Sequence, residues 1–334
     1  YGGKSKLLEF IAEVADQEVP GHEKLSDLFA GTGVVGSHFR KMGNIVHAND
    51  ILYFSYCLNV LSLSLDKGME WEAFGGLENV TTVLNELEGQ KGFITTQFSP
   101  SGSASRAYFS IFNAMKIDAI RSQIEEWALA GTISELEKAA LIGLLLKAIN
   151  RVSNVTGTYA AYLKTWDARA LKPLLLDASD AALEGPTGLV TNSDIFDLDM
   201  THRAQIAYLD PPYNHRDYAS NYFLLEVIAT GWFNNEFTPR GVTGMVKFQE
   251  KKSTFSSKRS VEDAFRKLFE HLNSEVTLLS YSDEGLFPIP NLLSMMSDYG
   301  EVSDVQKSHK RYRSINQDGS NHKLLEHVLV LRRR

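Results

Sequence analysis

The chain has 334 residues, a hydrophobic fraction of 43% and a net charge of −7 at pH 7. This length suits one large domain or two of ordinary size with a real core, and the acidic total argues mildly against a nucleic-acid partner. A single cysteine, Cys57, excludes an internal disulfide and fits a reducing compartment. No apolar run reaches the ~18 residues of a membrane span, and no leader opens the sequence. Because the chain starts at Tyr1 rather than Met, we expect that residues precede it.

The first fifty residues have the pattern of an α/β unit. Apolar residues recur with helical spacing over residues 6–14, and a short buried strand is predicted over 25–29. A glycine-rich turn follows, then a predicted helix over 34–42 and a second strand over 44–49 that ends before Asp50. This order of elements is typical of the start of a doubly wound α/β sheet.

The middle of the chain changes to a mainly helical pattern. One amphipathic helix is predicted over 113–129, and a Ser-to-Glu capping box at 134–137 precedes a long apolar helix. We therefore expect a helical insertion at 55–190, carried by a Rossmann-like α/β domain that is built from residues 1–54 and 190–334.

Alternating strands and helices resume near residue 188. Strands are predicted over 188–191, 205–209, 275–280 and 324–331, and helices over 218–230, 261–273 and 291–298. Two basic segments interrupt them. Residues 247–259 hold five basic side chains against one acidic one, and residues 307–313 hold four with no acid. We interpret both as loops, which are either solvated, as charge runs usually are, or in contact with nucleic-acid phosphates.

The turn DLFAGTGVVG at residues 27–36 has the features of a nucleoside-binding loop. Glycine lacks a Cβ, so the backbone can turn tightly and approach a ligand closely. Asp50, at the end of the next strand, can accept hydrogen bonds from ribose hydroxyls. Gly31, Gly33 and Gly36 also match GxGxxG, the pyrophosphate pattern of dinucleotide enzymes, so this turn alone leaves the cofactor open.

The tetrapeptide Asp210-Pro211-Pro212-Tyr213 narrows the chemistry. It directly follows an apolar strand, where α/β folds bind ligands, and it should occur by chance in about one chain in a thousand of this size. The amino group of adenine is a poor nucleophile because its lone pair is delocalised into the ring. The Asp210 carboxylate and the Pro211 carbonyl can accept hydrogen bonds from its two N–H groups. The ring of Tyr213 offers a face on which an extruded base can stack. A sulfonium methyl donor would need neither a metal nor a covalent nucleophile.

In these residues and their order, the sequence resembles the Dam-like adenine-specific DNA methyltransferases, and within them the type II restriction-modification enzymes similar to the FokI methylase. YGGKSKLLEFI at 1–11 resembles the N-terminal cofactor motif of that class, and FAGTG at 29–33 its FxGxG motif. Three segments resemble the FokI-type subgroup in particular: AYLKTWDARALKPL, YNHRDYASNYFLLE and SYSDEGLFP, at residues 161–174, 213–226 and 280–288.

The resemblance implies S-adenosyl-L-methionine as cofactor and double-stranded DNA as substrate. The cofactor residues would be Tyr1, Lys4, Asp27, Phe29, Ala30, Gly31, Gly33, Asp50, Asp194 and Asp210. The catalytic residues would be Asp210, Pro211, Pro212 and Tyr213, and the loop that follows would hold DNA through Asn214, His215 and Arg216. The basic segments add the candidate phosphate contacts Lys251, Lys252, Lys310 and Arg311.

The same resemblance implies that the insertion recognises the DNA site. It further implies a prokaryotic cytoplasmic protein at the nucleoid, with no membrane or metal, and a possible cognate restriction endonuclease.

Three alternatives stay open. An NAD-dependent oxidoreductase is supported by GxGxxG alone, and a non-enzymatic DNA-binding module would leave both motifs unused. An amino-methyltransferase could act on cytosine, RNA or a protein glutamine, but relatives with those substrates usually carry Ser or Asn in place of Asp210.

Overall fold

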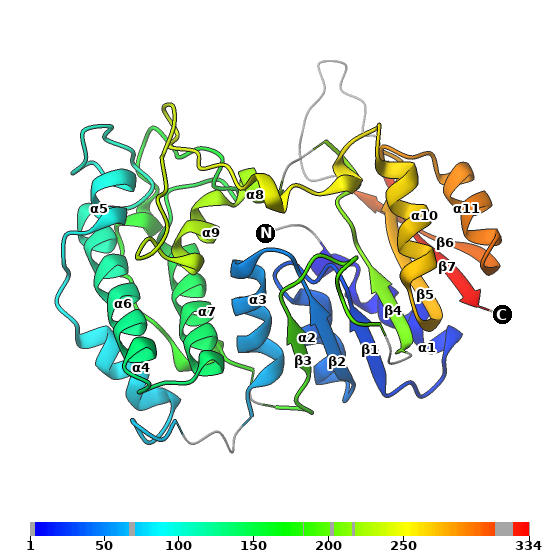
Figure 1. The fold of residues 1–334 in the computed structure, drawn as a ribbon, viewed down its shortest axis with the longest axis horizontal. Coiled ribbons are helices and arrows are strands. Elements are labelled where there is room, and N and C mark those ends of the chain that lie inside the picture. The colour runs from blue at the N-terminus through cyan, green and yellow to red at the C-terminus, as the bar shows by residue number, and fades with distance from the viewer. Residues whose placement is uncertain are drawn as a thin grey trace.

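The computed structural model describes residues 4–66, 71–182, 184–200, 204–215, 218–310 and 323–333. Within these residues, seven strands form one sheet in the order β3-β2-β1-β4-β5-β7-β6 (Figure 1). The strands are β1 (Lys24–Asp27), β2 (Ile45–Asn49), β3 (Leu189–Thr191), β4 (Ala204–Leu209), β5 (Ser274–Ser282), β6 (Gly300–Lys310) and β7 (Lys323–Arg333). Strands β1 to β5 are parallel, and β7 runs antiparallel to β5 and β6. This topology confirms the expected Rossmann-like α/β fold.

Strands β1 and β4 lie side by side in the middle of the sheet. From β1 the chain proceeds outward to β2 and β3 on one side, and from β4 it proceeds to β5 on the other. The strand order therefore reverses between β1 and β4. In open α/β sheets the crevice at the carboxyl ends of the strands at such a reversal is where ligands bind.

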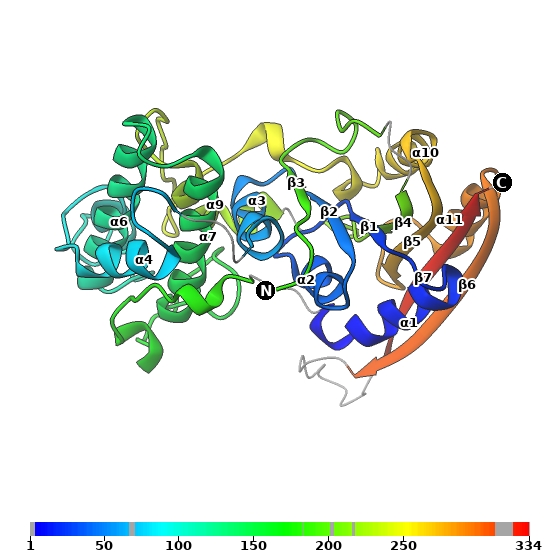
Figure 2. The same ribbon diagram turned by 90° about the horizontal axis from the view of Figure 1, so that it is seen from below.

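Helices cover both faces of the sheet (Figure 2). The helices α1 (Leu8–Glu18) and α2 (Val34–Lys41) bury apolar side chains against one face, together with Val46 and Ile206. The helices α10 (Val261–His271) and α11 (Ile289–Ser297) cover the other face, against Leu279 and Leu329. Both faces are thus shielded from water, as parallel sheets require.

A bundle of helices lies beside the β3 edge of the sheet (Figure 1). The remaining helices are α3 (Tyr53–Asn59), α4 (Leu77–Glu86), α5 (Phe93–Phe98), α6 (Ile111–Leu129), α7 (Glu135–Val152), α8 (Tyr218–Asn221) and α9 (Phe223–Thr230). The predicted capping box at Ser134 is present, and residues 139–149 are buried in α7 apart from Lys147. The apolar core of this bundle also takes in α9, which lies far along the chain.

The structure departs from the sequence-based expectations at several element boundaries, and three of the departures have a clear local cause. The first strand ends at Asp27, two residues early, because the glycine-rich turn begins there. The helix predicted over 218–230 is divided at Tyr222, whose ψ of 20° is not helical. The prediction of a loop at 307–310 is wrong, since these residues belong to β6, where Lys307 lies opposite Glu326. In the part of the chain that the structure describes, every helix is too short or too polar to span a bilayer.

Candidate active site

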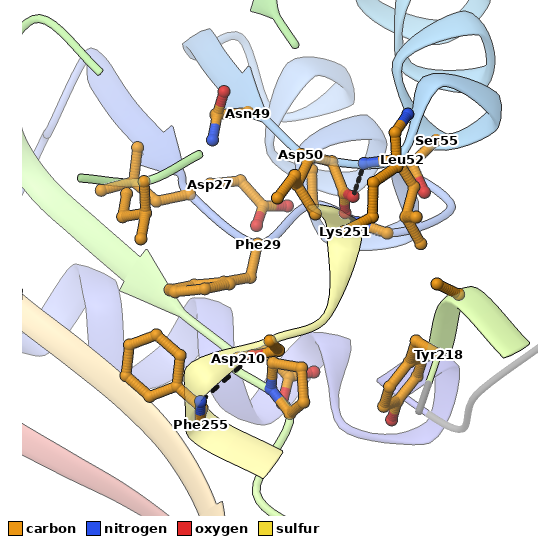
Figure 3. A pocket seen from close by; sticks show the side chains of 18 of the residues that line it. Asp27, Phe29, Asn49, Asp50, Leu52, Ser55, Asp210, Tyr218, Lys251 and Phe255 are labelled. Atoms are coloured by element: carbon orange, nitrogen blue, oxygen red, sulfur yellow. Dashed lines mark hydrogen bonds between the residues drawn. The ribbon is translucent and has the colours of Figure 1, made fainter. Parts of the chain in front are cut away.

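A cavity of about 440 Å³ lies at the carboxyl ends of β1, β2 and β4. Figure 3 shows side chains from all three strand ends pointing into it, among them Asp27, Asp50 and Asp210. The predicted residues that line it are Lys4, Asp27, Phe29, Ala30, Gly31, Asp50, Asp194, Asp210, Pro212, Tyr213, Asn214, Lys251 and Lys252. Gly33, Pro211 and His215 are not among the lining residues. Tyr1, Arg216, Arg311 and the side chain of Lys310 lie outside the described residues.

Asp50 and the glycine-rich turn hold each other in place. The N–H groups of Gly31 and Leu52 each donate a 2.8 Å hydrogen bond to one oxygen of the Asp50 carboxylate. Burial raises the pKa of Asp50 to about 6, although these two N–H groups favour its charged form. Gly31 and Gly33 have φ values of 53° and 77°, a region that favours glycine. Each Asp50 oxygen keeps lone pairs for a ligand hydroxyl.

Asn59, which no sequence motif indicated, supports this turn from the helix α3. Its side-chain N–H donates to the carbonyls of Gly31 at 3.0 Å and Ser55 at 2.8 Å. A Cβ built at Gly33 would lie 2.7 Å from the Asn59 Oδ1, so this glycine is required by space as well as by φ. Asn59 lies 28 residues beyond the loop it contacts, so only the tertiary structure reveals its role.

Asp27 is a buried carboxylate without a partner. It is 1% exposed, and neither oxygen has a hydrogen-bond partner among the described residues. Burial, followed by the nearby charge of Asp210, raises the pKa of Asp27 to about 8. The nearby Gly36 N–H favours the charged form. A buried acceptor left without a donor at the wall of a cavity fits a ligand that brings one.

Lys4 holds the carboxylate of Asp210 at the end of β4. The Lys4 Nζ is 3.3 Å from Asp210 Oδ1 and 3.5 Å from Glu326 Oε2, and it donates a 2.7 Å hydrogen bond to Ser280 Oγ. Burial alone would lower the pKa of Lys4, but the two carboxylates outweigh it and raise the pKa. Burial also raises the pKa of Asp210, and the Lys4 charge opposes that rise. The ammonium group therefore favours an ionised Asp210, which can only accept hydrogen bonds.

Aromatic rings form two walls near the cavity. The Phe255 ring packs edge-on against Phe29, with centroids 5.5 Å apart, and stacks on Phe196 at 6.1 Å. Tyr213 meets Tyr281 edge to face at 5.5 Å. The carbonyl of Tyr213 also accepts a 2.8 Å hydrogen bond from the Leu286 N–H. Phe196 and Phe255 were not predicted as site residues, although Phe196 lies two residues after Asp194 and Phe255 lies in the basic segment 247–259.

Lys251 lies at the cavity rather than in an open basic loop. Its ammonium group pairs with Glu226, a fully buried carboxylate on α9. Glu226 also accepts hydrogen bonds from the N–H groups of Tyr53 at 3.0 Å and Phe54 at 2.9 Å, at the start of α3. Lys252 is exposed. Both neighbouring lysines line the cavity, but Lys251 pairs with a buried carboxylate and Lys252 is exposed.

The reversal of the strand order and a cavity there that joins Asp50, the glycine-rich turn and Asp210 place the chain in the class of Rossmann-like α/β proteins that bind a ligand at this edge of the sheet. The model of one family, the D12 class N6 adenine-specific DNA methyltransferases, matches residues 1–283. The chain belongs to this family, which confirms the resemblance that its motifs indicated.

Known relatives agree with this assignment. The chain is 37% identical over 322 residues to the type II methyltransferase M.FokI of Planomicrobium okeanokoites and 34% identical over 324 residues to the modification methylase StsI of Streptococcus sanguinis. Each match covers 94% of this chain and 49% of the relative, so the chain spans about half the length of both. It is 33% identical to the type II methyltransferase M.NlaIII of Neisseria lactamica, over 96% of this chain and 94% of that protein.

Proposed function

We propose that this chain transfers a methyl group from S-adenosyl-L-methionine to the 6-amino group of adenine in a short double-stranded DNA site. The observation that carries the proposal is Asp210, which lies within the tetrapeptide at the end of β4 with the Lys4 ammonium 3.3 Å from its Oδ1. It lines the same cavity as Asp50 and Gly31. An acceptor for an amine and a site for a nucleoside-type cofactor therefore share one space.

The residues of the cavity fit this cofactor. Asp50 offers acceptors for ribose hydroxyls, and Asp27 offers buried oxygens that lack a donor, suited to the amino group of the methionine part. Phe29, beside Phe255, offers an apolar surface at the same cavity, and Asp194 lines it as well. When bound, the cofactor supplies an electrophilic methyl group carried on a sulfonium.

The catalytic tetrapeptide would act by binding and orienting the target amine. The Asp210 carboxylate and the Pro211 carbonyl accept hydrogen bonds from its two N–H groups, which directs the nitrogen lone pair out of conjugation with the ring. Asp210 is also the group placed to receive the proton that the amine loses. Tyr213 stacks on the extruded base, an interaction worth about 1–3 kcal/mol per base.

Recognition of DNA would fall to the helical insertion at 55–190, with α9 as part of the same packed unit. Asn214 and His215 follow the catalytic tetrapeptide and would approach the DNA beside the extruded base, while Lys252 would bind a phosphate. We further propose that the protein works in a prokaryotic cytoplasm at the nucleoid, as the modification partner of a cognate restriction endonuclease.

A labelled-methyl assay tests this function. The protein is incubated with methyl-tritiated S-adenosylmethionine and unmethylated double-stranded DNA, and the DNA is hydrolysed to nucleosides. We expect the label in N6-methyladenine. Label in N4-methylcytosine, or label accepted only by RNA or protein, would contradict the proposal. A parallel incubation with NAD and alcohol or hydroxy-acid substrates should leave the nicotinamide unreduced.

A further inference from the structure

Strand β7 supports the catalytic tetrapeptide from both faces of the sheet. Because β7 runs antiparallel to β5, the segment of β7 that holds Glu326 and His327 lies beside the carboxyl end of β5. Consecutive residues of a strand point to opposite faces. Glu326 therefore reaches Lys4 on one face, and through it Asp210. His327 points to the other face and is paired in register with Tyr281.

His327 lies between two carboxylates. It is 5% exposed, and its Nδ1 is 2.9 and 3.0 Å from the two oxygens of Asp304 on β6. Its Nε2 is 3.0 Å from the Oδ1 of Asp283, in the segment that follows β5. Both ring nitrogens of His327 are therefore within hydrogen-bond distance of a carboxylate. This buried side chain joins β6, β7 and the segment after β5.

The segment that His327 anchors is bonded to Tyr213. It runs over residues 282–287, and its turn closes through a 2.8 Å hydrogen bond from the Gly285 N–H to the Ser282 carbonyl. The next N–H, of Leu286, donates to the Tyr213 carbonyl at 2.8 Å. A Cβ at Gly285 would come within 2.2 Å of the Tyr281 ring, so the segment has little room to shift. A displacement at Asp283 therefore moves the support of the tetrapeptide.

We propose that Asp283 and His327 are positioning residues that set the place of Tyr213 at the target-base site. The inference rests on the proposed function, because it assigns Tyr213 to the base. Neither residue would touch DNA or cofactor. Their contribution is geometric: Asp304 fixes the imidazole, the imidazole fixes Asp283, and Asp283 fixes the turn whose Leu286 N–H holds Tyr213. Small displacements of an orienting group slow a reaction strongly.

Substitutions at Asp283 test the chain of contacts, since this side chain is half exposed and its loss should not prevent folding. Asp283→Ala removes the acceptor, whereas Asp283→Asn keeps a carbonyl oxygen for the Nε2–H. We expect kcat for DNA methylation to fall about tenfold in Asp283→Ala, to recover largely in Asp283→Asn, and the Kd for S-adenosylmethionine to stay within about twofold of wild type in both.

Arg332→Gln is the matched control. Arg332 lies at the far end of the same strand and forms a bidentate pair with Glu18 at 2.5 and 2.6 Å. Its loss should lower Tm while the kcat of the folded protein stays at the wild-type value. Wild-type kcat in Asp283→Ala would overturn the inference, and so would a loss in Asp283→Ala no larger than in Arg332→Gln at matched Tm.

Hydrogen exchange separates this inference from the proposed function. The Leu286 amide should exchange faster in Asp283→Ala than in wild type, with or without any methylation activity, because its bond to Tyr213 loosens. A wild-type protein that methylates no adenine would defeat the proposed function and the assignment of Tyr213 to the base. Unchanged exchange at Leu286 would defeat the positioning role alone.

Discussion

Two buried aspartates, one in the helical bundle and one at the edge of the sheet, have opposite surroundings. Asp118 in α6 and Asp27 in β1 are each 1% exposed. Asp118 accepts hydrogen bonds from the N–H groups of Gly92, Ile94 and Thr95 at 2.8 to 3.0 Å, and from the Thr95 hydroxyl at 2.6 Å. Asp27 has no such partner among the described residues. A satisfied buried carboxylate serves the fold, and an unsatisfied one at a cavity wall is available to a ligand.

The same contrast extends to the buried cations. In the bundle, Lys116 donates to the carbonyls of Asn85 and Leu87, and Arg121 donates to those of Ile228 and Ala229. These contacts join helix ends, and neither side chain lines the cavity. At the edge of the sheet, Lys4 instead faces the Asp210 carboxylate within the cavity. Burial alone therefore does not mark a functional residue; the identity of its partners does.

The largest effect should come from the acceptor at the edge of the sheet. Asp210→Ala should lower the turnover number at least about a hundredfold, because the target amine loses an orienting acceptor. Cofactor affinity should stay close to that of wild type. Asp50→Ala should do the reverse and weaken cofactor binding strongly. Calorimetry with S-adenosylmethionine and a tritium-transfer assay measure both, and full activity in Asp210→Ala would reject the mechanism.

In the bundle, substitution should affect the fold and spare the chemistry. Asp118→Ala leaves three N–H groups, two of them buried, without an acceptor and should lower the free energy of unfolding by about 3 kcal/mol. Denaturant titration measures this loss, and the kcat per folded molecule should stay unchanged. Asp27→Ala is the matched substitution, for which we expect weaker cofactor binding and no comparable loss of stability. Equal losses of stability in the two variants would break the comparison.

The pH dependence of stability should report on Asp27 in the cofactor-free protein. Its folded-state pKa is raised from the model-compound value of 3.8 to about 8, so between these values the folded state holds a proton that the unfolded state releases. Stability therefore falls as pH rises from about 4 to about 8. Asp27→Asn cannot ionise and should flatten this decline. Urea midpoints at pH 5 and pH 8 test it, and an unchanged slope would show that Asp27 is ionised throughout.

The smallest effect should come from the basic segment. Lys252→Ala removes one exposed cation and should reduce the salt dependence of DNA binding by about one unit of log–log slope. Lys251→Ala removes the partner of the buried Glu226 instead. It should destabilise the cofactor side of the cavity, and it should change the slope less than Lys252→Ala does. Binding titrations over a range of salt concentrations distinguish the two, and identical slopes for both variants would show that the lysines are equivalent.

The sequence by itself determined much of the architecture and the part of the site that lies in recognisable motifs. The period of apolar residues placed α2, α6 and α7 to within two or three residues, because amphipathic patterns are local. The glycine-rich turn, Asp50 and the tetrapeptide at 210–213 could be recognised because each directly follows a predicted strand. Parallel strands end at one edge of the sheet, so their convergence followed from the order of elements.

Contacts between distant segments were decided only by the tertiary structure. β6 has few apolar residues and forms because β7 offers it a hydrogen-bonding edge. Asn59 became a support of the glycine-rich turn, and Lys251 became the partner of Glu226, through contacts across 28 and 25 residues. Asp27 and Asp118 have the same side chain and the same burial. The donors around them separate the two: those of Asp118 come from a segment that the fold brings to α6, and Asp27 has no hydrogen-bond donor among the described residues.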